Sequence, residues 1–131
     1  MATRVLLRPS LLAVAILVAG AQLGHSQAEE KVDFRNQIQP ILSANCYECH
    51  GPDEESREAG LRLDKKESAF ADLGGYANIS PGDPEDSELY IRISAEFAEE
   101  RMPPDGVGPG LTAEQIGLIR LWIEQGARWD E

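Results

Sequence analysis

The sequence predicts a small all-α domain, and three observations support this fold class. Two segments, over residues 32–45 and 112–126, repeat apolar side chains at helical spacing. No segment shows the sustained alternation of apolar and polar residues that is typical of β-strands. The chain has 131 residues, which is enough for one small domain but not for two. We therefore expect an N-terminal helix and a C-terminal helix, with short helices and loops between them.

The first 28 residues predict a secretory signal peptide. Arg4 and Arg8 give a basic start, residues 11–21 are almost entirely apolar, and Ser26 and Ala28 are the small residues of a cleavage site after Ala28. The apolar run is shorter than the about 20 residues that a membrane span needs. The competing interpretation is an uncleaved signal anchor, which would hold the protein at a membrane. We expect a signal peptide over 1–28 and an exported domain over 29–131, in the periplasm or an equivalent space.

The charge balance excludes nucleic acid as a partner. The net charge is −11, and cleavage after Ala28 makes it −13 because it removes Arg4, Arg8 and no acid. Nucleic-acid phosphates require Lys and Arg to displace their counterions. The acidic surface fits a soluble exported protein, or one that meets a basic partner by electrostatic steering. The few large apolar residues also suggest that a disulfide, a metal or a large apolar cofactor supplements the core.

The N-terminal helix is predicted over residues 32–45. Asp33 is a suitable N-cap. Pro40 lies inside the segment, so the helix should kink or restart there. One helical face is apolar, and it consists of Phe34, Ile38, Ile41 and Leu42.

The middle of the chain predicts short elements. Residues 51–53 form a turn, residues 53–58 are a charged stretch, and residues 65–73 form a short helix closed by Gly74 and Gly75. The next helix is expected to begin with Asp83 as N-cap and Pro84 at its first position. Its inward residues would be Leu89, Tyr90 and Ile93.

Residues 102–110 contain three prolines and three glycines and predict a loop without regular structure. Thr112 then opens the clearest helix of the chain, because Gln115 completes a capping box. Gly126 is its expected C-cap. The inward stripe of this helix is Ile116, Ile119 and Ile123, with Trp122 beside them.

The segment Cys46-Tyr47-Glu48-Cys49-His50 is the attachment motif of a c-type haem. Two cysteines three residues apart at a helix end reach the two vinyl groups on one haem edge. The next residue then falls below the ring, where an imidazole is the expected iron ligand. We therefore predict one haem c, held by thioethers to Cys46 and Cys49, with His50 on the iron.

Three other interpretations of the motif are weaker. A zinc site needs about four ligands, and the predicted mature chain has no Cys or His outside the motif. A thioredoxin-like redox pair would need a βαβ context. A Cys46–Cys49 disulfide leaves His50 unexplained.

The second axial ligand follows by elimination. His25 and Met1 leave with the signal peptide, so His50 and Met102 are the only His and Met of the mature chain. Prolines 103 and 104 stiffen the backbone after Met102, which suits a weak thioether donor. The alternatives are that Met102 fills a gap in the core, that the iron has five ligands, or that a Lys or the terminal amine binds it.

The aromatic residues have two interpretations. Tyr90, Phe97, Trp122 and Trp129 could pack against the haem face, although aromatic residues at helical spacing usually belong to the core. Phe34 and the isoleucine stripe of the C-terminal helix are expected to hold the two terminal helices together.

The chain resembles the Planctomycete-type cytochrome c domain, over nearly all of residues 32–130. This resemblance implies a class I cytochrome c-like fold, with haem on Cys46 and Cys49 and iron bound by His50 and Met102. In that family the domain commonly stands at the N-terminus of a larger exported protein. The segments that carry the resemblance are residues 33–34, 38–42, 46–53, 59–64, 81–89, 101–104, 111–112 and 122–127.

The functional hypothesis is an exported monohaem cytochrome that carries electrons, alone or as the electron-transfer domain of a larger oxidoreductase. Its partner would be a redox protein or a fused downstream domain. The alternative is a haem-based enzyme or ligand sensor, in which Met102 is absent from the iron or leaves it. A haem-free interaction module closed by a disulfide is the third interpretation.

Overall fold

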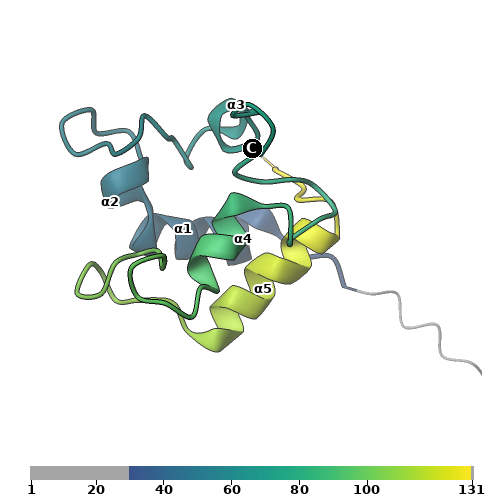
Figure 1. Cartoon of the computed structure of the whole chain (residues 1–131). Helices are drawn as coiled ribbons and strands as arrows, with labels where there is room; N and C mark the ends of the chain where they lie inside the picture. Colours follow the sequence, from purple (N-terminus) through teal and green to yellow (C-terminus); the bar gives the residue numbers. More distant parts are fainter. Residues whose placement is uncertain (1–29, 131) are drawn as a thin grey trace, which may run out of the picture.

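The computed structural model describes residues 30–130, so the signal peptide predicted over 1–28 lies outside the described residues. The element order is η1 (Phe34–Ile38), α1 (Gln39–Asn45), α2 (Tyr47–His50), α3 (Lys66–Ala69), α4 (Glu88–Ile93) and α5 (Ala113–Glu124). Within residues 30–130, β-type pairing is limited to isolated bridges of Ala77 with Asp72 and Ser87. The predicted all-α fold class is confirmed (Figure 1).

The N-terminal helix restarts at Pro40, as the sequence predicts. The Asp33 carboxylate caps its first turn, because it accepts a hydrogen bond from the Asn36 amide at 2.9 Å. Pro40 has no N–H to donate to the preceding turn. The chain before it winds as the π-helix η1, and α1 then begins at Gln39 with proline in its first turn.

The predicted helix over 65–73 is shorter in the structure. Its regular part, α3, ends at Ala69, and Phe70 is the C-cap. The Asp72 carboxylate accepts hydrogen bonds from the amides of Gly74 and Gly75 at 2.9 and 3.0 Å. An aspartate that binds the backbone of the following residues favours a turn over a helix, and this turn ends the element early.

The N-cap prediction for α4 is wrong, because the helix begins at Glu88 and Ser87 is its N-cap. Asp83 instead caps a turn by accepting from the amide of Asp86 at 3.1 Å. The buried Ser87 hydroxyl donates to the carbonyl of Asp83 at 2.8 Å and accepts from the amide of Ser80 at 2.9 Å. The loop over 80–87 is therefore folded around Ser87. Leu89 and Ile93 are buried, and Tyr90 is half-buried.

The capping box predicted for α5 is confirmed. The Gln115 amide donates to the Thr112 hydroxyl at 3.2 Å, and the Thr112 amide donates to the Gln115 side chain at 2.9 Å. The C-cap is Gln125, one residue before the predicted Gly126, which follows it with a φ of +95°. The inward face is buried at Ile119, Trp122 and Ile123 and half-buried at Ile116.

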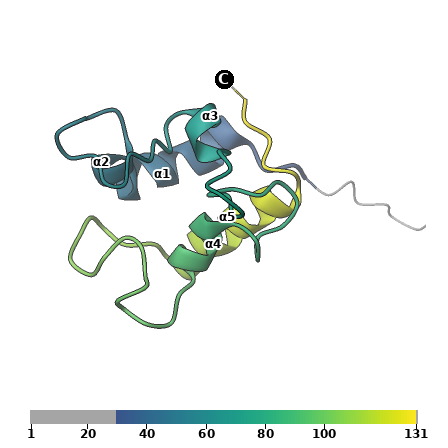
Figure 2. The same cartoon turned by 45° about the horizontal axis from the view of Figure 1, so that its top comes forward.

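The two ends of the domain meet through aromatic side chains, and Phe34 is the one that was predicted to join the terminal helices. Phe34 lies 5.5 Å from Trp122 and stacks on Trp129 at 4.0 Å, both measured between ring centroids. The chain after α5 runs back towards α3 (Figure 1). There the rings of Trp129 and Phe70 pack edge to face, with 5.8 Å between their centroids. This packing joins the N-terminal helix, α3 and the C-terminal segment into one core. It leaves α2 and the loop over 95–111 on the other side of the molecule (Figure 2).

Candidate functional site

The Cys46–His50 segment lies at the end of the N-terminal helix, as predicted. Cys46 ends α1 with its amide donating to the Leu42 carbonyl at 2.8 Å, and its φ of −122° interrupts the helix. The four-residue α2 follows, and the His50 amide donates to the Cys46 carbonyl at 2.8 Å. The two cysteines and the histidine are therefore carried on one short turn of helix.

A cleft of about 240 Å³ brings the predicted site residues together. Cys46, Cys49 and His50 line one wall, whereas Met102 lines the cleft from the loop after α4. The remaining lining is mostly apolar and includes Leu61, Leu63, Leu89, Ile93, Pro103, Pro104 and Val107. In Figure 2, α2 and α4 with its following loop face each other across this side of the molecule. All four predicted residues thus share one apolar cleft.

Two polar side chains in the cleft have buried atoms without a hydrogen-bond partner. They are Nδ1 of His50 and Oδ1 of Asn45, whose amide nitrogen donates to the Ile41 carbonyl at 2.9 Å. Buried polar atoms are normally paired, so orphaned atoms in a cleft indicate a site that a ligand completes. Neither Cys46 nor Cys49 is in a disulfide.

Hydrogen bonds attach the segment after His50 to the carbonyl groups of α2. The Leu63 amide donates to the His50 carbonyl and the Glu58 amide to the Cys49 carbonyl, both at 2.8 Å. The Arg57 guanidinium donates to the carbonyls of Gly51 and Pro52 at 3.0 and 2.9 Å. Arg57 was not predicted from the sequence, because arginine contacts with loop carbonyls have no characteristic spacing.

Glycine is required at position 51, because the chain there passes close to the backbone of α2. A Cβ built on this residue would lie 2.2 Å from the Tyr47 carbonyl oxygen, which is part of the α2 backbone. Only glycine therefore fits directly after His50 without displacing α2.

The opposite wall contains an ion pair that was also not predicted from the sequence. The Arg92 guanidinium lies 2.7 Å from the Glu88 carboxylate, and both residues line the cleft. Their spacing of four residues on one helix is the signal that could have identified the pair.

Burial changes the acidity of two groups beside the cleft. Burial raises the pKa of the Cys46 thiol to about 12, so the residue is a neutral thiol at physiological pH. The pKa of Tyr47 is also raised to about 12, first by burial and then by the charges of Asp64 and Cys46. The Tyr47 hydroxyl is buried and has no hydrogen-bond partner.

The aromatic residues considered as haem contacts lie elsewhere. Trp122 is buried in the core with Phe34, and Trp129 stacks on the same ring. Phe97 is 64% exposed, and none of the four candidates lines the cleft. The two tryptophans therefore belong to the core. Phe97 belongs neither to the core nor to the lining of the cleft.

Residues 46–106 match the family model described as Planctomycete cytochrome C. The matched segment begins at Cys46 and contains all four predicted site residues. Residues 46–106 form a Planctomycete cytochrome c domain. No curated protein and no solved structure shows significant similarity to the chain.

A cytochrome c domain of this family implies haem c, and the residues of the cleft fit that group. Two unpaired thiols three residues apart precede a histidine with a buried, unpartnered ring nitrogen. Nearby apolar side chains form a lining suited to a macrocycle. In the part of the chain that the structure describes, no three His, Cys, Asp or Glu side chains form a group that could hold a bare metal ion.

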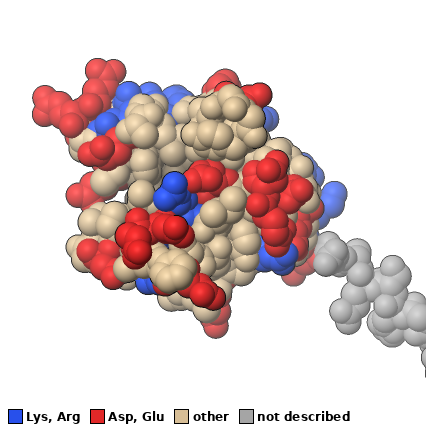
Figure 3. Space-filling view, viewed as in Figure 1, with Lys and Arg blue, Asp and Glu red and all other residues tan. Residues whose placement is uncertain are grey.

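Domains of the cytochrome c type typically work outside the cytoplasm. Among residues 30–130, no helix combines the length and the apolar character that crossing a bilayer requires. The acidic side chains are spread over the face seen in Figure 3, with the basic ones scattered between them.

Proposed function

We propose that this chain is an exported monohaem c-type cytochrome that transfers electrons. Cys46 and Cys49 would hold the haem through thioethers, and His50 and Met102 would bind its iron. The observation that supports this proposal most is the apolar cleft that all four residues line. Haem iron with His and Met ligands exchanges one electron at a raised potential.

The residues of the cleft have separable roles in this proposal. The two cysteines hold the cofactor permanently, so that it stays bound in both oxidation states. His50 would bind the iron through one ring nitrogen and carry the ring proton on the other, and its Nδ1 is buried without a hydrogen-bond partner. The apolar side chains exclude water, which disfavours the extra charge of the oxidised state.

The proposed location is the periplasm or an equivalent space, reached through the signal peptide of residues 1–28. Attachment of haem c requires unpaired thiols, and both cysteines are unpaired.

The proposed partner is a redox protein, or a downstream domain fused to this one. A net charge of −11 favours a partner with a basic contact surface.

Substitution of Met102 tests the assignment of the second ligand. In Met102→Ala the iron would lose its sixth ligand, so the ferrous protein should bind carbon monoxide at least about tenfold more tightly than the wild type. Met102→His should restore a six-coordinate spectrum and lower the reduction potential, because a His/Met pair raises it. Titrations followed by visible absorption measure both effects.

Leu73→Ala is the matched control, because Leu73 is similarly exposed and lies outside the cleft. It should leave carbon monoxide binding unchanged. Tight carbon monoxide binding by the wild type would contradict Met102 ligation. That result would favour a haem-based sensor or enzyme with an open iron position.

A further inference from the structure

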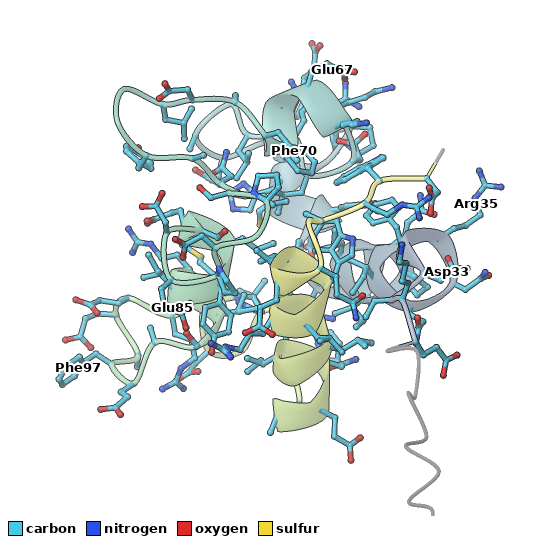
Figure 4. The ribbon with its side chains drawn as sticks, turned by 90° about the vertical axis from the view of Figure 1, so that its right-hand side faces the viewer. Asp33, Arg35, Glu67, Phe70, Glu85 and Phe97 are labelled. Carbon is cyan, nitrogen blue, oxygen red and sulfur yellow. The ribbon has the colours of Figure 1, made fainter. Side chains whose placement is uncertain are left out.

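The loop over residues 95–101 leaves the end of α4 and returns to it at Met102. The Met102 amide donates to the Arg92 carbonyl at 3.1 Å, which closes the loop. Phe97 is 64% exposed and points away from the molecule in Figure 4. Because its only large apolar side chain faces solvent, the loop has no core of its own. Polar contacts must therefore fix the position of Met102 over the cleft.

Arg101 supplies the strongest of these contacts. Its Nε donates to the Ala95 carbonyl at 2.9 Å, and its Nη2 donates to the Glu96 carbonyl at 2.7 Å. Hydrogen bonds from a charged guanidinium are stronger than those between neutral groups. The residue directly before Met102 is thus tied to the two residues at which the loop begins.

The other side-chain contacts of the loop are weaker. The Arg101 guanidinium and the Asp105 carboxylate are 4.0 Å apart, and the Asp105 side chain is 76% exposed. An ion pair of this kind contributes little. Arg92 reaches the Glu100 carbonyl only at 3.4 Å. The two carbonyl contacts of Arg101 therefore dominate.

We propose that Arg101 is the positioning residue for Met102. Its guanidinium closes the 95–101 loop and thereby keeps the thioether of the next residue in the cleft. Arg101 does not line the cleft, so it acts through the loop and not by contact with the cofactor. This inference rests on the proposed function, because it assumes that Met102 binds the iron.

Two substitutions test the role of the guanidinium in the haem-loaded protein. Arg101→Gln removes the charge. Arg101→Lys keeps the charge, but a single ammonium group cannot reproduce the two separate N–H donors that bind the carbonyls of Ala95 and Glu96. Imidazole binds ferric haem only where the thioether has left the iron, so its apparent affinity reports the fraction of open loop. We expect this affinity to rise about tenfold in both variants. The weak long-wavelength absorption of thioether-bound ferric haem should fall in parallel, and the Met102 amide should exchange its hydrogen faster.

Arg120→Gln is the matched control. The Arg120 side chain is 38% exposed and that of Arg101 is 39% exposed, and both are paired with acids. The control variant should keep the wild-type imidazole affinity. Wild-type affinity in Arg101→Gln or Arg101→Lys would overturn the inference while leaving Met102 ligation intact. Absence of the thioether absorption band from the wild type would overturn Met102 ligation and the inference with it.

Discussion

At the scale of single residues, the site depends on side chains of two kinds. In the proposed function, four residues carry the chemistry: Cys46, Cys49, His50 and Met102. Others hold the backbone around them, as Arg57 does with the carbonyls of Gly51 and Pro52. The backbone holders matter because α2 has only four residues and cannot fix its own position.

Gly51→Ala tests this backbone requirement. The added methyl group would meet the Tyr47 carbonyl at 2.2 Å, so α2 or the following turn must shift. We expect a lower yield of haem-loaded protein and a loss of about 1–3 kcal/mol in the free energy of unfolding. Haem content per protein and urea titrations measure the two effects.

Gly117→Ala is the control for this substitution. A Cβ at Gly117 meets no atom within 4 Å, and the residue lies inside α5. The change should stabilise the protein by about 1 kcal/mol, because alanine favours a helix over glycine. If Gly51→Ala keeps the wild-type haem content and stability, the turn accommodates a Cβ at position 51, and the requirement for glycine is wrong.

The four proposed site residues were predicted from the sequence and remain a prediction, whereas the residues that hold the backbone around them were not predicted. Cys46, Cys49 and His50 stand at the spacing of the haem c attachment motif, which is local in the sequence. Met102 followed from the absence of any other methionine in the predicted mature chain. Arg57 and Arg101 donate to carbonyl groups that come close to them only in the folded loops. No spacing in the sequence predicts these contacts.

At the scale of elements, helices with local signals were predicted well. The capping box of Thr112 and Gln115 at the start of α5 needs only two residues three positions apart, and it was predicted correctly. The start of α4 was misplaced, because Asp83 and Pro84 favour a turn as well as a helix start. The contact of Ser87 with Ser80, across the folded loop, decides between the two. This contact depends on tertiary structure.

Thr112→Ala tests the contribution of the capping box. It removes the hydroxyl that accepts from the Gln115 amide at 3.2 Å, so the free energy of unfolding should fall by about 1 kcal/mol. For a domain of this size, the melting temperature should fall by about 4–8 °C. Thr112→Ser keeps the hydroxyl and should remain close to the wild type. Equal melting temperatures for all three proteins would show that α5 does not depend on its cap.

At the scale of the whole molecule, the core and the cleft occupy different sides of a small domain. The aromatic cluster of Phe34, Trp122 and Trp129 joins the two ends of the chain. The cleft is lined by residues of α2, α4 and the loop after α4, and within it Nδ1 of His50 and Oδ1 of Asn45 have no hydrogen-bond partner. A bound macrocycle would supply the missing contacts, which agrees with the small apolar core expected from composition.

The acidic side chains also predict how stability depends on pH. The pKa values of Asp33, Asp64 and Asp72 lie below the ordinary 3.8, because the folded chain donates hydrogen bonds to each carboxylate. The donors are Asn36, Arg62, and Gly75 with Gly74, respectively. A lowered pKa stabilises the fold above the ordinary value, and this contribution is lost as the pH falls through the lowered one.

We therefore expect the urea midpoint to fall as the pH drops below about 4. Asp33→Asn and Asp72→Asn should each flatten this dependence, whereas Glu99→Gln, at an exposed position, should not. Urea titrations of the haem-loaded protein between neutral and acid pH measure the slope. A curve that is equally steep in all variants would contradict the assignment to these aspartates.

The most direct test of the account is whether haem is bound covalently to Cys46 and Cys49. The full chain is expressed with a cytochrome c maturation system, and visible spectra are recorded before and after acid-acetone extraction. We expect haem to stay with the wild-type protein and to be extracted from the Cys46→Ser/Cys49→Ser variant. Haem that is extracted from the wild type, or that never loads, would contradict the account and would favour a disulfide between the two cysteines.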